Sequence, residues 1–295
     1  MKTSNFRIWL LFFVTTVVMA LIAQLLILPV MFPVLHAGHG LLVGGDWIGF
    51  HQIAQELAER IQSEGWSAWE LRPYGHSPAG IAAAFYAVFV SEPYALIPFN
   101  AAVHASSGVI LMIILHHITG DRLIALLGAI PFVAFPSAAT WYAQIHRDGY
   151  YILGMLLFCY GWVRIAANAE HDQRWWQPSF VLILTVFFGT VFVWAARPYA
   201  FYLLFAVLLL LAVFVLSLML WRGLKQRIFS KKAVVESLSI ILLLSSFHLV
   251  IKYKWLEGVD VRLRNASTTE LVLMNFVAEK STGTEKSTGT EKSTG

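Results

Sequence analysis

The sequence predicts an all-α, polytopic membrane protein with about seven transmembrane helices and an amphipathic helix in its first outer loop. Hydrophobic residues make up 58% of the 295-residue chain, whereas soluble domains contain about 45–50%. Charged residues make up only 13%, and the apolar residues gather in runs long enough to cross a membrane. These values exclude a soluble globular domain, a disordered chain and a collagen-like fibre.

Charge, cysteine and aromatic content exclude further classes of protein and site. The formal net charge of +4 is too small to indicate binding to nucleic acid. Cys159 is the single cysteine, which excludes an internal disulfide and a cysteine-based zinc site. The 11 tryptophans and 10 tyrosines are typical of a protein with two membrane interfaces.

The first predicted span covers residues 8–35 and follows Lys2 and Arg7. It is far longer than the apolar core of a signal peptide, which has about 7–15 residues. Because positive residues stay on the cytoplasmic side, we expect the N-terminus in the cytoplasm and the chain in the plasma (inner) membrane. The later apolar stretches cover 78–92, 94–117, 122–143, 149–167, 179–195, 199–221 and 234–251.

Charge fixes the predicted orientation of these spans. The segment 221–232 is the strongest cytoplasmic marker, since it carries five cations and no acid: Arg222, Lys225, Arg227, Lys231 and Lys232. Counting spans back from it and forward from Lys2 places the loop 36–77, the turn 146–148 and Arg197 on the outer face. The counts agree only if the short stretch 78–92, which Pro93 ends, dips into the membrane or lies at its surface.

The outer loop 36–77 contains the predicted amphipathic helix, over residues 47–62. Phe50, Ile53, Leu57 and Ile61 recur at three- and four-residue spacing, and polar side chains occupy the other positions. We expect this helix to lie on the membrane surface. An ordinary packed loop helix is the alternative, and the two do not exclude each other. The transmembrane domain is then 1–251, followed by a mixed segment 252–278 and a repeat, EKSTGT, over 279–295 that we expect to be disordered.

Asp46 is the first candidate catalytic residue. It follows Gly44 and Gly45, which allow close approach of backbone or ligand, and it precedes His51 by five residues. A carboxylate at the membrane boundary could serve as a general base, with His51 contributing to substrate binding. The alternative is that Asp46 caps the helix that follows.

Arg147, Asp148 and Arg197 are the other charged candidates. An arginine beside an acid at an outer helix junction could bind an anionic headgroup and a hydroxyl; the alternative is a turn in which Asp148 caps the next helix. Arg197, followed by Pro198 and Tyr199, interrupts a long apolar run. Because a lipid-facing arginine is costly, it needs a partner, which could be Asp148, Asp46 or a phosphate.

Four histidines of the outer loop, His36, His39, His51 and His76, are potential metal ligands together with Asp46. Their spacing matches no familiar site, so a divalent metal is the weaker alternative. His116 and His117 are explained by the dipole at a helix end. The sequence contains no P-loop, dinucleotide fingerprint, nucleophile elbow or HExxH motif.

The order of these features resembles the bacterial GT-C-fold membrane glycosyltransferases, the group that includes the dolichyl-phosphate-mannose protein mannosyltransferases. The resemblance rests on Gly45-Asp46 after the first span, on residues 77–80 (SPAG), on 136–144 (PSAATWYAQ) leading into Arg147-Asp148, and on Arg197-Pro198-Tyr199. It covers about residues 1–250. It implies transfer of a sugar from a polyprenyl-phosphate donor to an acceptor at the outer face. Asp46 and Asp148 would be the catalytic carboxylates, with Asp46 deprotonating the acceptor hydroxyl, and Arg147 and Arg197 would hold the carrier phosphate.

Members of that group usually have more spans and a soluble C-terminal domain, so we expect an N-terminal portion or a short relative. The expected partners are membrane lipid, a lipid-linked sugar and a subunit that supplies missing helices. A second hypothesis is a non-catalytic membrane subunit that binds a lipid-phosphate headgroup or an assembly enzyme. A third, weaker hypothesis is a transporter. The predicted helices are interrupted near 92–94 and 196–198, and these interruptions resemble the discontinuous helices of transporters.

Overall fold

The computed structural model describes residues 4–168 and 177–200, with isolated positions between 203 and 245. Within these residues the chain is helical, and its β structure is limited to one isolated bridge between His36 and Leu42. The predicted all-α class is therefore confirmed. The chain divides into two compact units, Met1–Ile241 and Leu242–Gly295, and the elements described below belong to the first.

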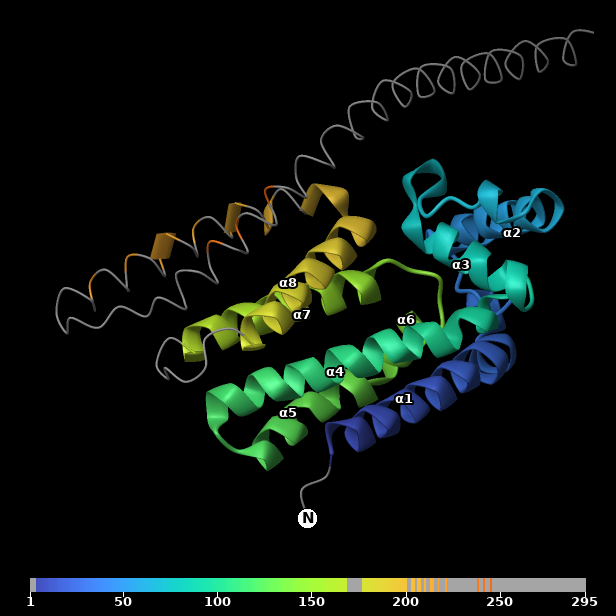
Figure 1. The fold of residues 1–295 in the computed structure, drawn as a ribbon. Helices are drawn as coiled ribbons and strands as arrows, with labels where there is room; N and C mark the ends of the chain where they lie inside the picture. The colour runs from blue at the N-terminus through green and yellow to red at the C-terminus, as the bar shows by residue number, and fades with distance from the viewer. Residues whose placement is uncertain are drawn as a thin grey trace, which may run out of the picture. The chain divides into compact units, whose positions relative to one another are not determined.

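The described helices begin with a long helix that changes its winding and end with an antiparallel pair (Figure 1). In chain order they are α1 (Asn5–Ile22), η1 (Ala23–Met31), η2 (Pro33–Leu35), α2 (Trp47–Glu64), η3 (Trp66–Ala68), η4 (Pro73–Gly75), α3 (Ser77–Val88), η5 (Pro93–Leu96), α4 (Ile97–Thr119), α5 (Arg122–Ala134), α6 (Pro136–Tyr142), α7 (Asp148–Asn168) and α8 (Gln177–Ala196).

Within the part of the chain that the structure describes, two helical segments are long and apolar enough to cross a membrane, Asn5–Met31 and Pro93–Thr119. Shorter apolar helices cover Ser77–Val88, Arg122–Ala134 and Val181–Ala196. The predicted stretches 149–167 and 179–195 are helices α7 and α8. Most of the predicted spans 199–221 and 234–251, and all of 252–278 and the repeat 279–295, lie outside the described residues.

Helices α1, α4 and α5 lie side by side (Figure 1). Small residues allow their close packing, because Ala105, Ala125 and Ala129 have no exposed surface and sit in one apolar cluster with Phe12 and Val133. The outer side of α1 is different, since large apolar side chains remain exposed there: Leu11, Val14 and Val18. An uncovered apolar stripe of this kind is what a helix in contact with lipid presents.

The predicted single span at 122–143 is wrong in one respect, because it is two helices. α5 ends at Ala134, and Phe135 adopts extended backbone with φ −67° and ψ 130° before α6 begins at Pro136. A proline has no N–H to donate and disfavours helical backbone in the residue before it. The break lets the chain from Pro136 to Tyr142 turn across α1 and α4, which both contact α6.

The predicted amphipathic helix is α2, and it packs on α3. Phe50, Leu57 and Ile61 are buried against the small residues of α3 in one cluster, which also holds Ala82 and Ala83. The apolar face of α2 is therefore engaged within the protein, as the packed-helix alternative requires.

Helices α7 and α8 approach each other more closely than large side chains would allow. A Cβ atom built on Gly154 would lie 2.7 Å from the Gly189 carbonyl oxygen, and one on Gly189 would lie 2.8 Å from the Gly154 carbonyl oxygen. Further along α7, Gly161 faces Val186. Since rising numbers on α7 meet falling numbers on α8, the pair is antiparallel, and the start of α7 lies beside the end of α8.

Candidate functional site

Two ion pairs bring the four predicted charged residues together. An Arg147 Nη2 donates to Asp46 Oδ2 at 3.4 Å, and Arg197 Nη2 donates to Asp148 Oδ1 at 2.5 Å. All four side chains line one pocket of about 280 Å³, called here the charged pocket. Its remaining wall is Gly44, Gly45, Trp47, Phe50, Trp141, Ile145 and His146. Residues from three distant parts of the chain thus meet at one place.

Asp46 does not cap α2, so that alternative is wrong. Its side chain accepts no hydrogen bond from the helix, and its backbone is itself helical, with φ −61° and ψ −22°. A capping residue needs extended backbone to aim its oxygen at the second or third amide of the helix. The Asp46 carboxylate is instead 70% exposed beside Arg147, which leaves it accessible to a ligand.

His146 provides the hydrogen bonds at the start of α7, where the capping alternative put Asp148. Its Nδ1 atom accepts from the backbone N–H of Asp148 at 3.1 Å and of Gly149 at 3.3 Å. This leaves the Asp148 carboxylate free to bind Arg197. An Nδ1 atom that accepts puts the proton of the neutral ring on Nε2. Burial supports the neutral form, since it lowers the pKa of His146 to about 4.

Arg197 is held from three sides. Besides Asp148, its Nη1 atom donates to the Tyr199 hydroxyl at 3.0 Å, and its guanidinium carbon lies 5.4 Å from the centre of the Tyr151 ring. The hydrogen bond with Asp148 is the main cause of a raised pKa for Arg197. Its backbone N–H ends α8 by donating to Val193. Arg197 and Tyr199, which the sequence analysis singled out together, are therefore joined by a direct hydrogen bond.

His51 lies apart from the charged pocket. Its ring is 96% buried between α2 and α3, where Nδ1 is 2.8 Å from the Tyr86 hydroxyl. The ring centre of His39 is 4.9 Å away, and burial lowers the pKa of His51. The predicted contact of His51 with the substrate therefore has no counterpart among the residues that line the pocket.

A buried amide network holds the segment that carries Arg147 and Asp148. The Asn100 Nδ2 group donates to the carbonyl oxygens of Tyr142 and Gln144, each at 3.1 Å. The Gln144 side chain in turn accepts from the Leu42 N–H at 3.0 Å and donates to the Gly40 carbonyl at 3.2 Å. This ties α4, the 142–146 segment and the outer loop together. Asn100 was not among the candidates predicted from the sequence. The signal that could have identified it is a polar amide side chain within an apolar run.

A second cavity adjoins the charged pocket and shares Trp141, His146, Asp148 and Arg197 with it. Its volume is about 510 Å³, and we call it the histidine cavity. Apolar side chains of α5 and α7 form part of the wall. Besides the shared Asp148 and Arg197, the polar part includes His104, Tyr142 and His146. The last three residues were not among the sequence-predicted candidates.

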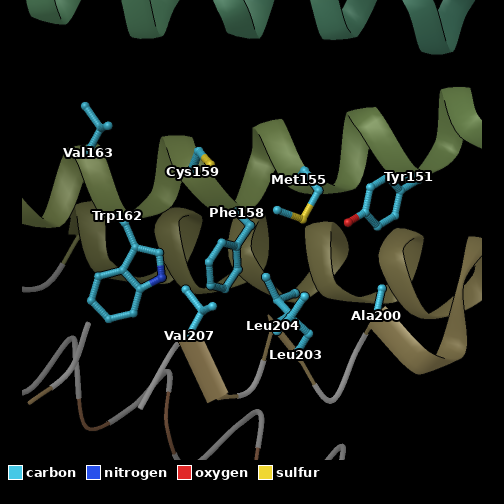
Figure 2. A pocket seen from close by; sticks show the side chains of 10 residues that line it. All are labelled: Tyr151, Met155, Phe158, Cys159, Trp162, Val163, Ala200, Leu203, Leu204 and Val207. Carbon is cyan, nitrogen blue, oxygen red and sulfur yellow. The ribbon is translucent and has the colours of Figure 1, made fainter. Parts of the chain in front are cut away.

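A third hollow, the apolar groove, continues from Tyr151, which it shares with the histidine cavity. Figure 2 shows α7 side chains facing Ala200, Leu203, Leu204 and Val207 across this groove of about 340 Å³. On α7 the lining residues are Tyr151, Met155, Phe158, Cys159, Trp162 and Val163. Because a helix rises 1.5 Å per residue, this stripe runs for about 18 Å along α7.

The histidines proposed as metal ligands have other contacts. His36 Nε2 accepts from the Gly40 N–H at 2.9 Å, and His39 Nδ1 is 2.9 Å from a Glu92 carboxylate oxygen. Among the residues that the structure describes, no group of three or more His, Cys, Asp or Glu side chains is placed to hold a metal ion.

Comparisons with known protein families, with curated proteins and with solved structures found no match for this chain. The assignment of function therefore rests on the geometry of the site.

Proposed function

We propose that this chain is a membrane glycosyltransferase, or part of one, that transfers a sugar from a polyprenyl-phosphate donor to an acceptor hydroxyl at the outer face. The observation that carries the proposal is the convergence of Asp46, Arg147, Asp148 and Arg197 on one pocket. The GT-C glycosyltransferases, which the sequence order resembles, use acids and arginines at these places.

The hollows match an amphiphilic donor. The charged pocket offers two guanidinium groups, which suit phosphate oxygens because of their planar forks. The apolar groove offers a long hydrocarbon wall, which suits a polyprenyl chain. Tyr151 lines the apolar groove and also lies under the Arg197 guanidinium, so phosphate and lipid sites are joined. A soluble sugar nucleotide has no hydrocarbon chain that could fill the apolar groove.

The proposed reaction is a direct displacement at the anomeric carbon of the donor sugar. The Asp46 carboxylate takes the acceptor hydroxyl proton as the acceptor oxygen forms its bond to that carbon. The bond from the carbon to the phosphate oxygen breaks, and its electron pair leaves with polyprenyl phosphate. Arg147 and Arg197 stabilise the charge on the leaving phosphate. A single displacement inverts the anomeric centre.

Asp148 has a different part in this scheme. Its carboxylate binds Arg197 at 2.5 Å and so fixes the direction of the guanidinium fork. Asp46 is the more accessible of the two acids, at 70% against 38% side-chain exposure. We therefore assign the proton transfer to Asp46 and the positioning of Arg197 to Asp148.

The proposal includes the predicted seven-span arrangement with a cytoplasmic N-terminus. Its test is labelling of intact cells with a membrane-impermeant thiol reagent, on single cysteines at 46, 148 and 197 in a Cys159→Ser background. All three should label from outside. Labelling of position 148 from the cytoplasm alone would mean that residues 78–92 cross the membrane, and it would sink the outer-face site.

The function itself is tested with the full chain in lipid nanodiscs. Transfer or hydrolysis of extracted lipid-linked sugars is measured for the wild type, for Asp46→Asn and for Glu59→Gln, a matched exposed acid on α2, the helix that directly follows Asp46. Loss of a general base lowers the rate by about 10²–10⁴-fold, so Asp46→Asn should be inactive and Glu59→Gln unchanged. Equal rates for the wild type and Asp46→Asn would refute the catalytic assignment.

Binding of decaprenyl phosphate separates the enzyme from the second hypothesis. Arg197→Gln should weaken it by about 10–100-fold, the usual value of a charge-assisted hydrogen bond. Arg122→Gln serves as the control, because its guanidinium binds Asn5 at the opposite end of α4. Binding by the wild type without any transfer would favour the non-catalytic subunit.

A further inference from the structure

Several hydrogen-bonding atoms on the polar wall of the histidine cavity have no partner among the described residues. Within the described residues, the Tyr142 hydroxyl, His146 Nε2 and both ring nitrogens of His104 are buried and have no hydrogen-bond partner. The Val133 backbone lies beside the His104 ring. Tyr142, His146 and His104 are 95%, 94% and 99% buried, respectively.

Unused buried polar groups are rare because each loses its hydrogen bonds to water. Here three such side chains lie on one cavity wall, and the Tyr142 ring contacts both histidine rings. The His104 and Tyr142 ring centres are 3.8 Å apart, and those of Tyr142 and His146 are 5.4 Å apart. The cavity volume of about 510 Å³ lies within the range of about 300–1,000 Å³ that is usual for small-molecule sites.

The chemistry of the wall selects the class of ligand. His146 presents an N–H donor at Nε2, because its Nδ1 atom accepts from the start of α7. A tyrosine hydroxyl donates and accepts, and a neutral imidazole does both through its two nitrogens. A ligand that suits this set carries several hydroxyl groups and no charge. The Trp141 indole, which also lines the cavity, offers a flat apolar surface for a sugar ring.

We propose that the histidine cavity is the subsite for an uncharged hexose, with Tyr142, His146 and His104 as the residues that recognise its hydroxyl groups. This inference rests on the proposed function, since it places the sugar of the donor beside the phosphate-binding arginine. Arg197 lines both the charged pocket and the histidine cavity, so one ligand can reach both.

The test compares two ligands and two matched variants in nanodiscs. The ligands are decaprenyl phosphate, without a sugar, and decaprenyl-phosphate hexoses carrying glucose, mannose or galactose. Tyr142→Phe removes a hydroxyl that has no partner in the protein. Tyr150→Phe is the control, because it removes a buried hydroxyl that donates to Asn100 at 3.0 Å and does not line the cavity.

Tyr142→Phe should lower the affinity for one decaprenyl-phosphate hexose by about threefold to tenfold, the value of one hydrogen bond. The affinity for decaprenyl phosphate should not change, and Tyr150→Phe should show no such difference between the ligands. His146→Asn should repeat the hexose-specific loss, since its amide oxygen can still accept from the start of α7.

Three outcomes would overturn the inference. In the first, the wild type binds decaprenyl phosphate and the three hexose derivatives equally well, which leaves the lipid-phosphate site intact and the cavity filled by water. In the second, a charged sugar such as a uronic acid binds better than every hexose. In the third, no ligand binds at all, and the proposed function then fails as well.

Discussion

Asp148 and Arg197 are 49 residues apart in the sequence, and their side chains form the shortest ion pair in the described part of the chain. Asp148 stands in the first turn of α7, and Arg197 directly follows the last turn of α8. The antiparallel packing of the two helices thus places the pair where the charged pocket and the histidine cavity meet.

Neutralising Asp148 should separate its effect on stability from its effect on phosphate binding. Both partners are about one-third exposed, at 38% and 33%, so Asp148→Asn should lower the free energy of unfolding by only about 0–1 kcal/mol. The amide oxygen can still accept from Arg197, while one negative charge is gone. Decaprenyl phosphate should therefore bind several-fold more tightly. Weaker binding in this variant would show that the carboxylate charge itself is needed to hold the arginine.

Two glycine substitutions should have opposite effects on stability, because Gly154 lies in the close contact between α7 and α8 and Gly49 lies in open space on α2. Gly154→Ala would place a Cβ atom 2.7 Å from the Gly189 carbonyl oxygen, so the helices must separate and the Tm in detergent should fall. Gly49→Ala on α2 meets nothing within 4 Å and should raise stability by about 0.5–1 kcal/mol through helix propensity. A Gly154→Ala variant as stable as the wild type would contradict the close packing of the pair.

Asn100 should be the costliest single amide to remove. It donates to two carbonyl oxygens and accepts from Tyr150, so Asn100→Ala leaves three buried groups without their partner. Each such loss costs about 1–3 kcal/mol. Tyr150→Phe removes only one of these bonds and should cost about 1 kcal/mol. Thermal unfolding of both variants checks the order, and equal costs would mean that water replaces the lost amide.

Stability should fall as the solution is acidified below the ordinary pKa of histidine. Burial lowers the pKa of His146 from 6.5 to about 4, so between these values the unfolded chain binds a proton that the folded chain does not. The stabilisation is fully present above pH 6.5 and is lost towards pH 4, to a limit of about 3 kcal/mol. His146→Asn should show a shallower loss between pH 7 and 4, and an unchanged slope would assign the effect to other histidines.

The sequence identified the charged residues of the site but not their pairing. Asp46, Arg147, Asp148 and Arg197 stand out because charges are rare in an apolar chain, and the span count put them on one face. The sequence left three possible partners for Arg197, because the partner that Arg197 binds depends on how α7 and α8 pack. That packing follows from Gly154 and Gly189, whose contact no periodicity reveals.

The elements were easier to predict than their boundaries and contacts. Amphipathic spacing located α2 to within two residues at its end, yet its partner α3 could not be read from α2 alone. The break at Phe135 depended on one proline in an apolar run. Tyr142 and His146 were missed for a different reason: aromatic and histidine side chains are ordinary at a membrane surface, and only the three-dimensional arrangement shows that their polar atoms lack partners.

The antiparallel pairing of α7 and α8 also has a consequence in time. A ribosome adds about 5–20 residues per second, so Asp148 is made about 2–10 seconds before Arg197. During that interval the first turn of α7 carries the Asp148 carboxylate without Arg197, the cation that pairs with it in the folded chain. The charged pocket is therefore complete only after α8 has returned along α7 and brought Arg197 to Asp148.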